Sequence, residues 1–322
     1  MFLLAALLLR GSVLAQPSPA TQPSYTRRQD VVYGRVDGTA LTMDVFKPTG
    51  KRNGAIIVYL VSGGWMSSHD SIRPRFINAL LRPFLDRGYV VCAVVHGSQP
   101  KFTIPEITPQ INRAVQYVRA NAPAAGLNPD EIGICGASAG GHLSLYQATS
   151  PGTAHPSSSD PVERVSGEVQ AVACFFPPTD FLNYGGPNQT CMPLVHKTIL
   201  APALDFRELD DESKLWVPVT EKRRVEILRE LSPINHITSH TPPTLIIQGD
   251  ADTLVPLQQA ESFIAKLKAA HVDCELVVKP GLGHGWPMIG PDMERCADWF
   301  DAHLLKKTKP DNRTTTHPSR AE

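Results

Sequence analysis

The stretch "GICGASAGG", from Gly133 to Gly141, carries the pattern of a buried strand into that of a helix. Apolar residues precede Gly136, and a helical pattern begins at about Ala139. Gly136, Ser138 and Gly140 have the spacing Gly-x-Ser-x-Gly. A serine on a sharp strand-to-helix turn brings the backbone on either side into close contact, and glycine leaves room because it lacks a Cβ. We therefore predict that Ser138 is a nucleophile at the end of a buried strand.

Other short apolar runs surround this one, and all have the length of strands buried on both faces of a parallel sheet. The six runs, of which Glu131–Cys135 is the one before Ser138, are Ala55–Val61, Tyr89–Val95, Glu131–Cys135, Ala171–Phe176, Thr244–Gln248 and Glu275–Val278. Before them, the segment Val31–Pro48 alternates apolar and polar residues around the turn "VDG". This alternation predicts an antiparallel hairpin at the edge of the sheet.

Helical patterns alternate with the predicted strands. Apolar residues recur at helical spacing over residues 76–84, 107–118, 260–267 and 293–300. Alternating strands and helices predict an α/β fold with a mostly parallel sheet and helices on both faces. Catalytic loops are then expected at the carboxyl ends of the strands.

Length and charge exclude several classes of protein. The chain has 322 residues, enough to bury a large core without metals or disulfides. Lys plus Arg and Asp plus Glu both number 31, so there is no basic field to attract nucleic acid. A small-molecule partner is therefore expected.

Both ends of the chain and one internal segment depart from the α/β pattern. Residues 1–15 are apolar and end in "VLA", which predicts a signal peptide and export to the periplasm or the cell exterior. We expect a linker at 16–30, the folded domain at 31–305 and a disordered polar tail at 306–322. Residues 182–231 are too long for a simple connection and predict a cap over the site. Beyond the signal peptide, no segment is apolar enough to insert stably in a membrane.

The six cysteines form neither a disulfide framework nor the paired spacing of a zinc site. Cys92, Cys135 and Cys174 lie in apolar runs and are expected to be buried thiols. The other three lie near element ends or in polar surroundings, and a single disulfide among them stays open: Cys191, Cys274 and Cys296. No metal site is expected.

A serine nucleophile needs a base and an acid that orients the base. "TLIIQGDADTLVP" places Asp250 and Asp252 just after a buried strand, and "ELVVKPGLGHGW" places His284 after the last one. The chain order Ser138, Asp252, His284 is that of one known triad arrangement. We therefore predict these three as catalytic, with Asp250 and then Asp180 as alternative acids.

In the stretch "VYLVSGGWMSSH", from Val58 to His69, an apolar run typical of a buried strand is followed by Gly63 and Gly64, which have no side chains. Backbone N–H groups aimed at the developing oxyanion are a large stabilising factor in acyl transfer, and glycines let a substrate approach them. We predict an oxyanion hole made by the backbone of Gly63, Gly64 and Ala139. Trp65 is predicted to fix this loop or to wall the substrate pocket, and Asp180 is a second pocket candidate.

These residues give the chain a family resemblance over about Val31 to Leu305. It resembles the α/β-hydrolase fold serine esterases, in particular the bacterial feruloyl and acetyl-xylan esterase-like enzymes and the hormone-sensitive-lipase-like carboxylesterases. The segments that carry the resemblance are "GASAGGHLS", "SGGW", "PPTLIIQGDADTLVP", "GLGHGW" and "DGTALTMDVFKP". It implies a sheet of the eight-stranded type with a cap insertion, and it implies that the protein cleaves carboxylic esters.

The chain departs from the family pattern at two places. Members commonly carry His-Gly-Gly-Gly-Trp where this sequence has Val61-Ser62-Gly63-Gly64-Trp65, so the histidine that usually braces the loop is missing. "HGSQP", which begins at His96, stands where Tyr-Arg is often found. These changes affect the geometry of the oxyanion loop and the shape of the pocket.

The preferred hypothesis is a serine ester hydrolase that forms an acyl-enzyme on a small or carbohydrate-linked ester and needs no metal or organic cofactor. A peptidase of the prolyl-oligopeptidase kind shares the Asp and His loops, but no propeller-sized segment precedes the hairpin. The third reading is a non-catalytic exported binding module on the same fold. The complete Ser, Asp and His set argues against this third reading.

Overall fold

The structure is a computed structural model that describes residues 24–196, 198–287 and 289–305. The predicted signal peptide, the linker before residue 24 and the predicted tail at 306–322 lie outside these residues. A central sheet of eight strands has the order β1-β2-β4-β3-β5-β6-β9-β10. Its strands are β1 (Tyr25–Val36), β2 (Thr39–Pro48), β3 (Ile56–Leu60), β4 (Val90–Val95), β5 (Ile132–Ala137), β6 (Ala171–Phe175), β9 (Thr244–Gly249) and β10 (Cys274–Lys279).

Strand direction confirms the predicted fold class. β1 pairs with β2, and β2 with β4, in antiparallel fashion, whereas all pairs from β4 to β10 are parallel. Each strand that the apolar runs predicted is present within one or two residues of its expected bounds. The sheet is therefore a parallel core with an antiparallel hairpin at one edge.

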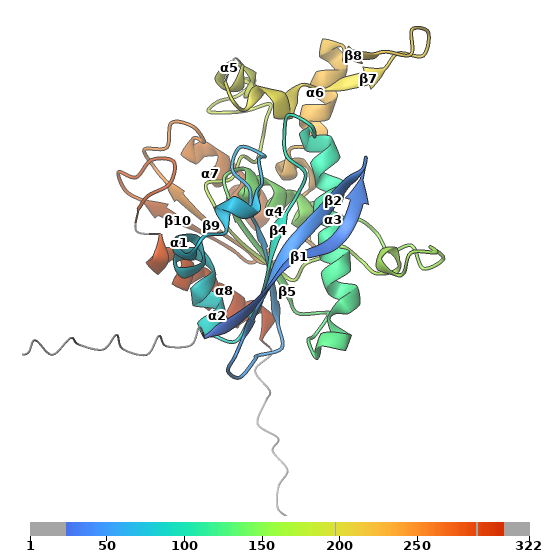
Figure 1. Cartoon of the computed structure of the whole chain (residues 1–322). Coiled ribbons are helices and arrows are strands. Elements are labelled where there is room, and N and C mark those ends of the chain that lie inside the picture. The colour runs from blue at the N-terminus through green and yellow to red at the C-terminus, as the bar shows by residue number, and fades with distance from the viewer. Residues whose placement is uncertain (1–23, 197, 288, 306–322) are drawn as a thin grey trace, which may run out of the picture.

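Helices cover both faces of the sheet, as Figure 1 shows. α3 (Ile104–Asn121), α4 (Ala139–Thr149) and α7 (Leu257–Ala269) pack on one face, and the helical segment 74–86 and α8 (Gly290–Leu304) pack on the other. On β3, Ile56, Val58 and Leu60 face the first group while Ile57 and Tyr59 face the second. This alternation buries apolar side chains in two separate layers.

The remaining helical elements are short. The segment 74–86 consists of α1 (Pro74–Phe76), a π-helical turn η2 (Ile77–Leu81) and α2 (Arg82–Asp86). Single turns of 3₁₀ helix occur at η1 (His69–Ser71), η3 (Pro123–Ala125), η4 (Pro161–Arg164) and η6 (Pro233–His236).

The predicted linker at 16–30 is wrong at its carboxyl end, because β1 already begins at Tyr25. This part of the strand is polar and carries no apolar alternation. Specific contacts with β2 hold it instead: Arg27 forms an ion pair with buried Asp44 (Nη2–Oδ2 2.5 Å), and the ring of Tyr25 packs edge-on against Phe46. Such pairs are set by the fold and leave no periodic pattern in the sequence.

The segment between β6 and β9 lies above the carboxyl ends of the parallel strands (Figure 1). It contains α5 (Met192–Val195), η5 (Ala201–Leu204), the small antiparallel pair β7 (Arg207–Leu209) and β8 (Trp216–Pro218), and α6 (Glu221–Glu230). The side chain of Thr220 caps α6 by accepting a hydrogen bond from the N–H of Arg223 (3.2 Å). We refer to residues 182–231 as the cap segment.

All six cysteines lie in the described part of the chain, and each is a free thiol. The disulfide that the sequence left open among Cys191, Cys274 and Cys296 is therefore absent from these residues. Burial raises the pKa of Cys92 and Cys191 to about 12, so both thiols stay protonated at neutral pH. Among the described helices, none combines the length and the apolar character that a membrane crossing requires.

Candidate active site

Ser138 lies at the sharp turn between β5 and α4, with φ 54° and ψ −119°. Few L-residues adopt a positive φ of this kind, so the turn stores strain. The nearby glycines are required by close contacts: a Cβ on Gly136 would lie 2.5 Å from the carbonyl oxygen of Gly140, and one on Gly140 would lie 3.0 Å from that of Leu60. The Gly-x-Ser-x-Gly spacing thus presents the hydroxyl of Ser138 above the sheet.

His284 connects Ser138 with a buried carboxylate. Its Nε2 lies 2.9 Å from the Oγ of Ser138, and its Nδ1 lies 2.8 Å from Oδ2 of Asp252. Because a carboxylate only accepts, Nδ1 carries the hydrogen and Nε2 is free to take the proton of the serine. The three side chains that the sequence singled out are therefore joined by hydrogen bonds in the order a triad requires.

Asp252 is held rigidly as an anion. Burial by itself would raise the pKa of this carboxyl, but hydrogen bonds from His284 and from the N–H groups of Val255 and Leu254 outweigh it and lower the pKa. Oδ1 accepts both backbone bonds at 2.9 Å, and Gln248 donates to Oδ2 at 3.1 Å. The carboxylate therefore stays charged and keeps the imidazole in one tautomer.

The two alternative acids have other partners. Asp250 accepts a hydrogen bond from the N–H of Gly281 (2.6 Å) and braces the turn before His284. Asp180 accepts hydrogen bonds from the N–H groups of Leu182 and Asn183 (3.0 and 3.1 Å), and so holds the backbone where the cap segment begins. Asp180 is not among the residues that line the cavity at Ser138, so its prediction as a pocket residue is wrong.

The predicted oxyanion hole is corrected at one position. The N–H of Gly63 donates to the carbonyl of Met66 (3.0 Å), because the loop closes on itself in a small β-bridge. That donor is therefore already used. Within the described residues, the N–H groups of Gly64 and Ala139 have no hydrogen-bond acceptor, and both residues line the cavity next to Ser138. They are the two donors that an oxyanion could meet.

Trp65 both fixes the loop and walls the cavity. It is 4% exposed with φ 58°, and its Nε1 donates to Nδ1 of His142 (3.3 Å). Nε2 of His142 lies 2.9 Å from the carbonyl of Leu231, so the imidazole joins the oxyanion loop to the end of α6. Burial lowers the pKa of His142 to about 4 and keeps it neutral. Sequence reasoning missed His142 because it stands inside a helix with no motif of its own.

A cavity of about 310 Å³ opens directly beside Ser138 and His284. Apart from the catalytic groups and the glycines, its walls are almost entirely apolar. Three of the exposed large apolar side chains of the molecule stand at this cavity: Met66, Ile199 and Leu254. Leu200 of the cap segment reaches over the oxyanion loop, since a Cβ built on Gly64 would lie 2.6 Å from its Cδ2. The space next to the nucleophile is thus suited to an apolar group.

Comparison with protein families places this arrangement in a known group. The model of the BD-FAE family matches residues 43–267, which include the oxyanion loop, Ser138 and Asp252. The chain belongs to the BD-FAE family. His284 lies beyond the matched residues, so its place at the site comes from the fold alone.

Relatives of this BD-FAE member carry esterase names. "Esterase LipC" of Mycobacterium tuberculosis is 26% identical over 82% of this chain and 61% of its own length. "Probable carboxylic ester hydrolase LipM" of the same organism is 27% identical over 76% of this chain and 52% of its own length. The chain thus spans about half to three fifths of these curated relatives.

Solved structures share the fold of the BD-FAE member. A truncated carbohydrate esterase from gut microbiota superposes with a TM-score of 0.67 at 24% identity, covering 87% of this chain and 96% of that one. A propionate-bound esterase from Thermogutta terrifontis gives a TM-score of 0.63 at 24% identity, covering 87% and 94%. These likenesses confirm the α/β-hydrolase fold.

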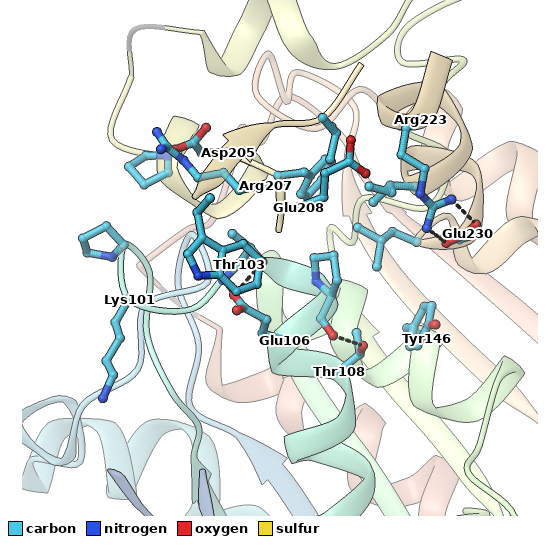
Figure 2. A pocket seen from close by; sticks show the side chains of 18 residues that line it. Lys101, Thr103, Glu106, Thr108, Tyr146, Asp205, Arg207, Glu208, Arg223 and Glu230 are labelled. Carbon is cyan, nitrogen blue, oxygen red and sulfur yellow. Dashed lines mark hydrogen bonds and ion pairs between the residues drawn. The ribbon is translucent and has the colours of Figure 1, made fainter. Parts of the chain in front are cut away.

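A larger cleft of about 690 Å³ lies apart from Ser138, between the cap segment, the start of α3 and the carboxyl-terminal part of α4 at Tyr146 (Figure 2). Four of its charged side chains form two ion pairs, and Glu106 accepts a backbone hydrogen bond. Arg223 contacts Glu230 at 2.9 Å, Arg207 contacts Asp205 at 3.1 Å, and Glu106 accepts from the N–H of Thr103 at 2.6 Å. η5 separates this cleft from the catalytic cavity, since Leu204 faces the cavity and Pro202 faces the cleft.

One group of side chains in the described residues of the BD-FAE member has the spacing of a cation site. Asp30, Asp44 and His69 lie together at the outer edge of the sheet. The guanidinium of Arg27 already contacts Asp44, with Nε 2.8 Å from Oδ2. Because this cation neutralises the one buried carboxylate, the group is better satisfied as an ion-pair cluster than as a metal site.

Proposed function

We propose that this protein is a serine hydrolase that cleaves carboxylic esters through an acyl-enzyme. The observation that carries the proposal is the hydrogen-bonded chain from Ser138 through His284 to Asp252. Membership of the BD-FAE family and the esterase names of the relatives support the same reaction class.

In the first half of the proposed reaction, the Oγ of Ser138 attacks the ester carbonyl carbon while Nε2 of His284 takes the hydroxyl proton. The carbonyl oxygen becomes negative and meets the N–H groups of Gly64 and Ala139. Asp252 stabilises the imidazolium. When the C–O bond to the alcohol breaks, His284 returns the proton to the alcohol oxygen and the acyl group stays on Ser138.

In the second half, a water molecule takes the place of the alcohol. His284 accepts a proton from the water as its oxygen attacks the acyl carbon, and the same two N–H groups meet the second oxyanion. Cleavage of the bond to Oγ returns the proton to Ser138 and releases the carboxylic acid. No other reactant is needed.

The substrate proposed here has an apolar acyl group larger than acetyl. This is supported by the apolar walls of the cavity at Ser138 and by the apolar side chains at its mouth. A carbohydrate-linked alcohol is the finer proposal, supported by the solved carbohydrate esterase that shares the fold. Export of the mature protein is likewise proposed from residues 1–15, and cell fractionation with amino-terminal sequencing tests it.

The test is a panel of 4-nitrophenyl esters from acetate to dodecanoate, run on the wild type and on Ser138→Ala. We expect turnover with the wild type, best on a medium-length acyl chain, and a loss of kcat of about 10⁴-fold or more in the variant. Peptide amides form a parallel panel. Amide cleavage without ester cleavage would favour a peptidase, and no turnover with either panel would favour a binding module.

A further inference from the structure

The oxyanion loop, residues 61–67, is held by the segment that follows the neighbouring strand β4. The N–H of Gln99 donates to the carbonyl of Trp65 (3.2 Å). The hydroxyl of Ser98 accepts from the N–H of Ser67 (2.7 Å) and donates to its carbonyl (2.8 Å). The far end of the loop is therefore tied to residues 96–99 and not only to its own turn.

The near end of the loop is tied to the same segment by a buried histidine. His96 is 3% exposed, and its Nε2 lies 2.8 Å from the Oγ of Ser62 while its Nδ1 lies 2.6 Å from the carbonyl oxygen of Gly97. A carbonyl only accepts, so Nδ1 carries the hydrogen and Nε2 accepts from the hydroxyl of Ser62. Burial lowers the pKa of His96 to about 4, which keeps this tautomer neutral near pH 7.

Ser62 stands between this histidine and the turn that carries the nucleophile. A Cβ built on Gly140 would lie 3.4 Å from the carbonyl oxygen of Ser62 and 3.5 Å from its Cβ. On the opposite side, the N–H of Gly97 donates to Oε1 of Gln110 on α3 (2.7 Å). A chain of contacts therefore runs from α3 through His96 and Ser62 to the start of α4.

We propose that His96 and Ser62 are positioning residues for the oxyanion hole. The imidazole accepts a hydrogen bond from the hydroxyl of Ser62 and so keeps this residue in place. Through Ser62 it also keeps the N–H groups of Gly64 and Ala139 at a fixed distance from each other. The contribution of such donors falls steeply when they move from the oxyanion position. The pair also joins the two places where the sequence departs from the family pattern. This proposal rests on the proposed esterase function.

The test compares Ser62→Ala with Ser62→Thr, which keeps a hydroxyl. We expect Ser62→Ala to lower kcat on 4-nitrophenyl butyrate by about tenfold, with KM within about twofold, because the donors act on the transition state. Affinity for n-butylboronic acid, which forms a tetrahedral adduct on the serine, should fall by the same factor as kcat. Ser62→Thr should retain most of both.

A matched control removes a buried hydroxyl far from the loop. Thr244 is fully buried at the amino end of β9, and its Oγ1 donates to the carbonyl of Pro242 (2.9 Å). Thr244→Val should lower the melting temperature without changing kcat. If Ser62→Ala keeps kcat within twofold, or if it loses activity only in proportion to its melting temperature, the positioning role is overturned.

A second readout does not depend on turnover. Nitrogen-15 NMR should show Nδ1 of His96 protonated and Nε2 bare in the wild type, with the Nε2 signal shifted in Ser62→Ala. A protonated Nε2 in the wild type would overturn the pairing. If the wild type neither cleaves esters nor is labelled at Ser138 by a fluorophosphonate, the proposed function fails. The proposed positioning role at the oxyanion hole then fails as well, while the NMR result still decides whether His96 and Ser62 form the hydrogen bond.

Discussion

Single side chains at this site are distinguished by their partners more than by their type. Asp250 and Asp252 are two positions apart after the same strand, yet only Asp252 reaches His284. The difference arises because the chain turns sharply between them, so that one carboxylate points into the fold and the other toward the turn at Gly281.

This difference predicts very unequal effects of removing the two charges. Asp252→Asn should lower kcat by about 10⁴-fold, because an amide cannot keep the imidazole in the required tautomer. Asp250→Asn should lower kcat less than tenfold, since its amide oxygen can still accept from Gly281. Steady-state kinetics and melting temperatures of both variants check this. Equal losses of kcat would contradict the assignment of the acid.

The two glycines of the oxyanion loop provide a second matched pair. Gly64 has φ 57°, and a Cβ there would lie 2.6 Å from Cδ2 of Leu200, whereas a Cβ on Gly63 would meet nothing within 4 Å. The N–H of Gly63 is also already bonded. We therefore expect Gly64→Ala to lower kcat at least tenfold and Gly63→Ala to leave it within about threefold. The reverse order would move the donor to Gly63.

At the scale of elements, buried neutral histidines connect parts of the fold that the sequence keeps apart. His142 joins α4 to the oxyanion loop and to the end of α6, and His96 joins β4 to the same loop. Each imidazole uses both ring nitrogens, one as donor and one as acceptor. Protonation would put a second donor where an acceptor is needed, so these connections depend on the neutral form.

These histidines predict acid sensitivity. Burial lowers the pKa of His96 and His142 from 6.5 to about 4. The unfolded chain therefore binds more protons between these values, and stability that is full above pH 6.5 is lost as the pH falls toward 4. Each of the two histidines should lower the unfolding free energy by about 2 kcal/mol when the pH falls from 7 to 5. Urea unfolding at both pH values measures the loss, and a stability that stays constant over this range would contradict it.

A variant separates the two contributions. The side chain introduced by His142→Gln cannot titrate. The fall in unfolding free energy between pH 7 and pH 5 should therefore be about 2 kcal/mol smaller in this variant than in the wild type. The comparison uses the slope against pH, so a uniform loss of stability in the variant does not affect it.

At the scale of the whole molecule, the cap segment closes the site over the sheet. The helix η5 separates the two cavities, and Leu200, just before it, covers the oxyanion loop. Under the proposed function, the cap segment therefore helps to determine which esters fit beside Ser138, together with Met66 and Leu254, whereas the sheet determines where the triad stands. The fit of a substrate and the position of the triad therefore depend in part on different segments of the chain.

This division predicts a change in acyl preference without loss of chemistry. Leu200→Ala widens the catalytic cavity, so the ratio of kcat/KM for octanoate over butyrate esters should rise about threefold to tenfold. Labelling of Ser138 by a fluorophosphonate should stay unchanged, because the hydrogen bonds of the triad do not involve Leu200. Phe206→Ala alters the cleft on the other side of η5 and is the control; an equal shift in that variant would contradict the assignment of the cavity.

The sequence by itself predicted the mostly parallel sheet, the alternation of strands and helices along the chain, and Ser138, Asp252 and His284 as the candidate triad, with Asp250 and Asp180 as alternative acids. Apolar runs and glycine spacing are local consequences of burial and close backbone contact, and they are visible in any chain that satisfies them. The start of β1 at Tyr25 was not predicted, because its polar residues are held by cross-strand side-chain pairs. Such pairs leave no periodic pattern in the sequence.

Only the tertiary structure decided which backbone groups are free. Gly63 and Gly64 are alike in the sequence, but the closure of the loop uses the N–H of Gly63 and leaves that of Gly64. The structure likewise brought Ser62 to His96 across 34 positions, and Trp65 to His142 across 77. Such contacts depend on how strands and loops meet in space, and residue type and spacing do not encode them.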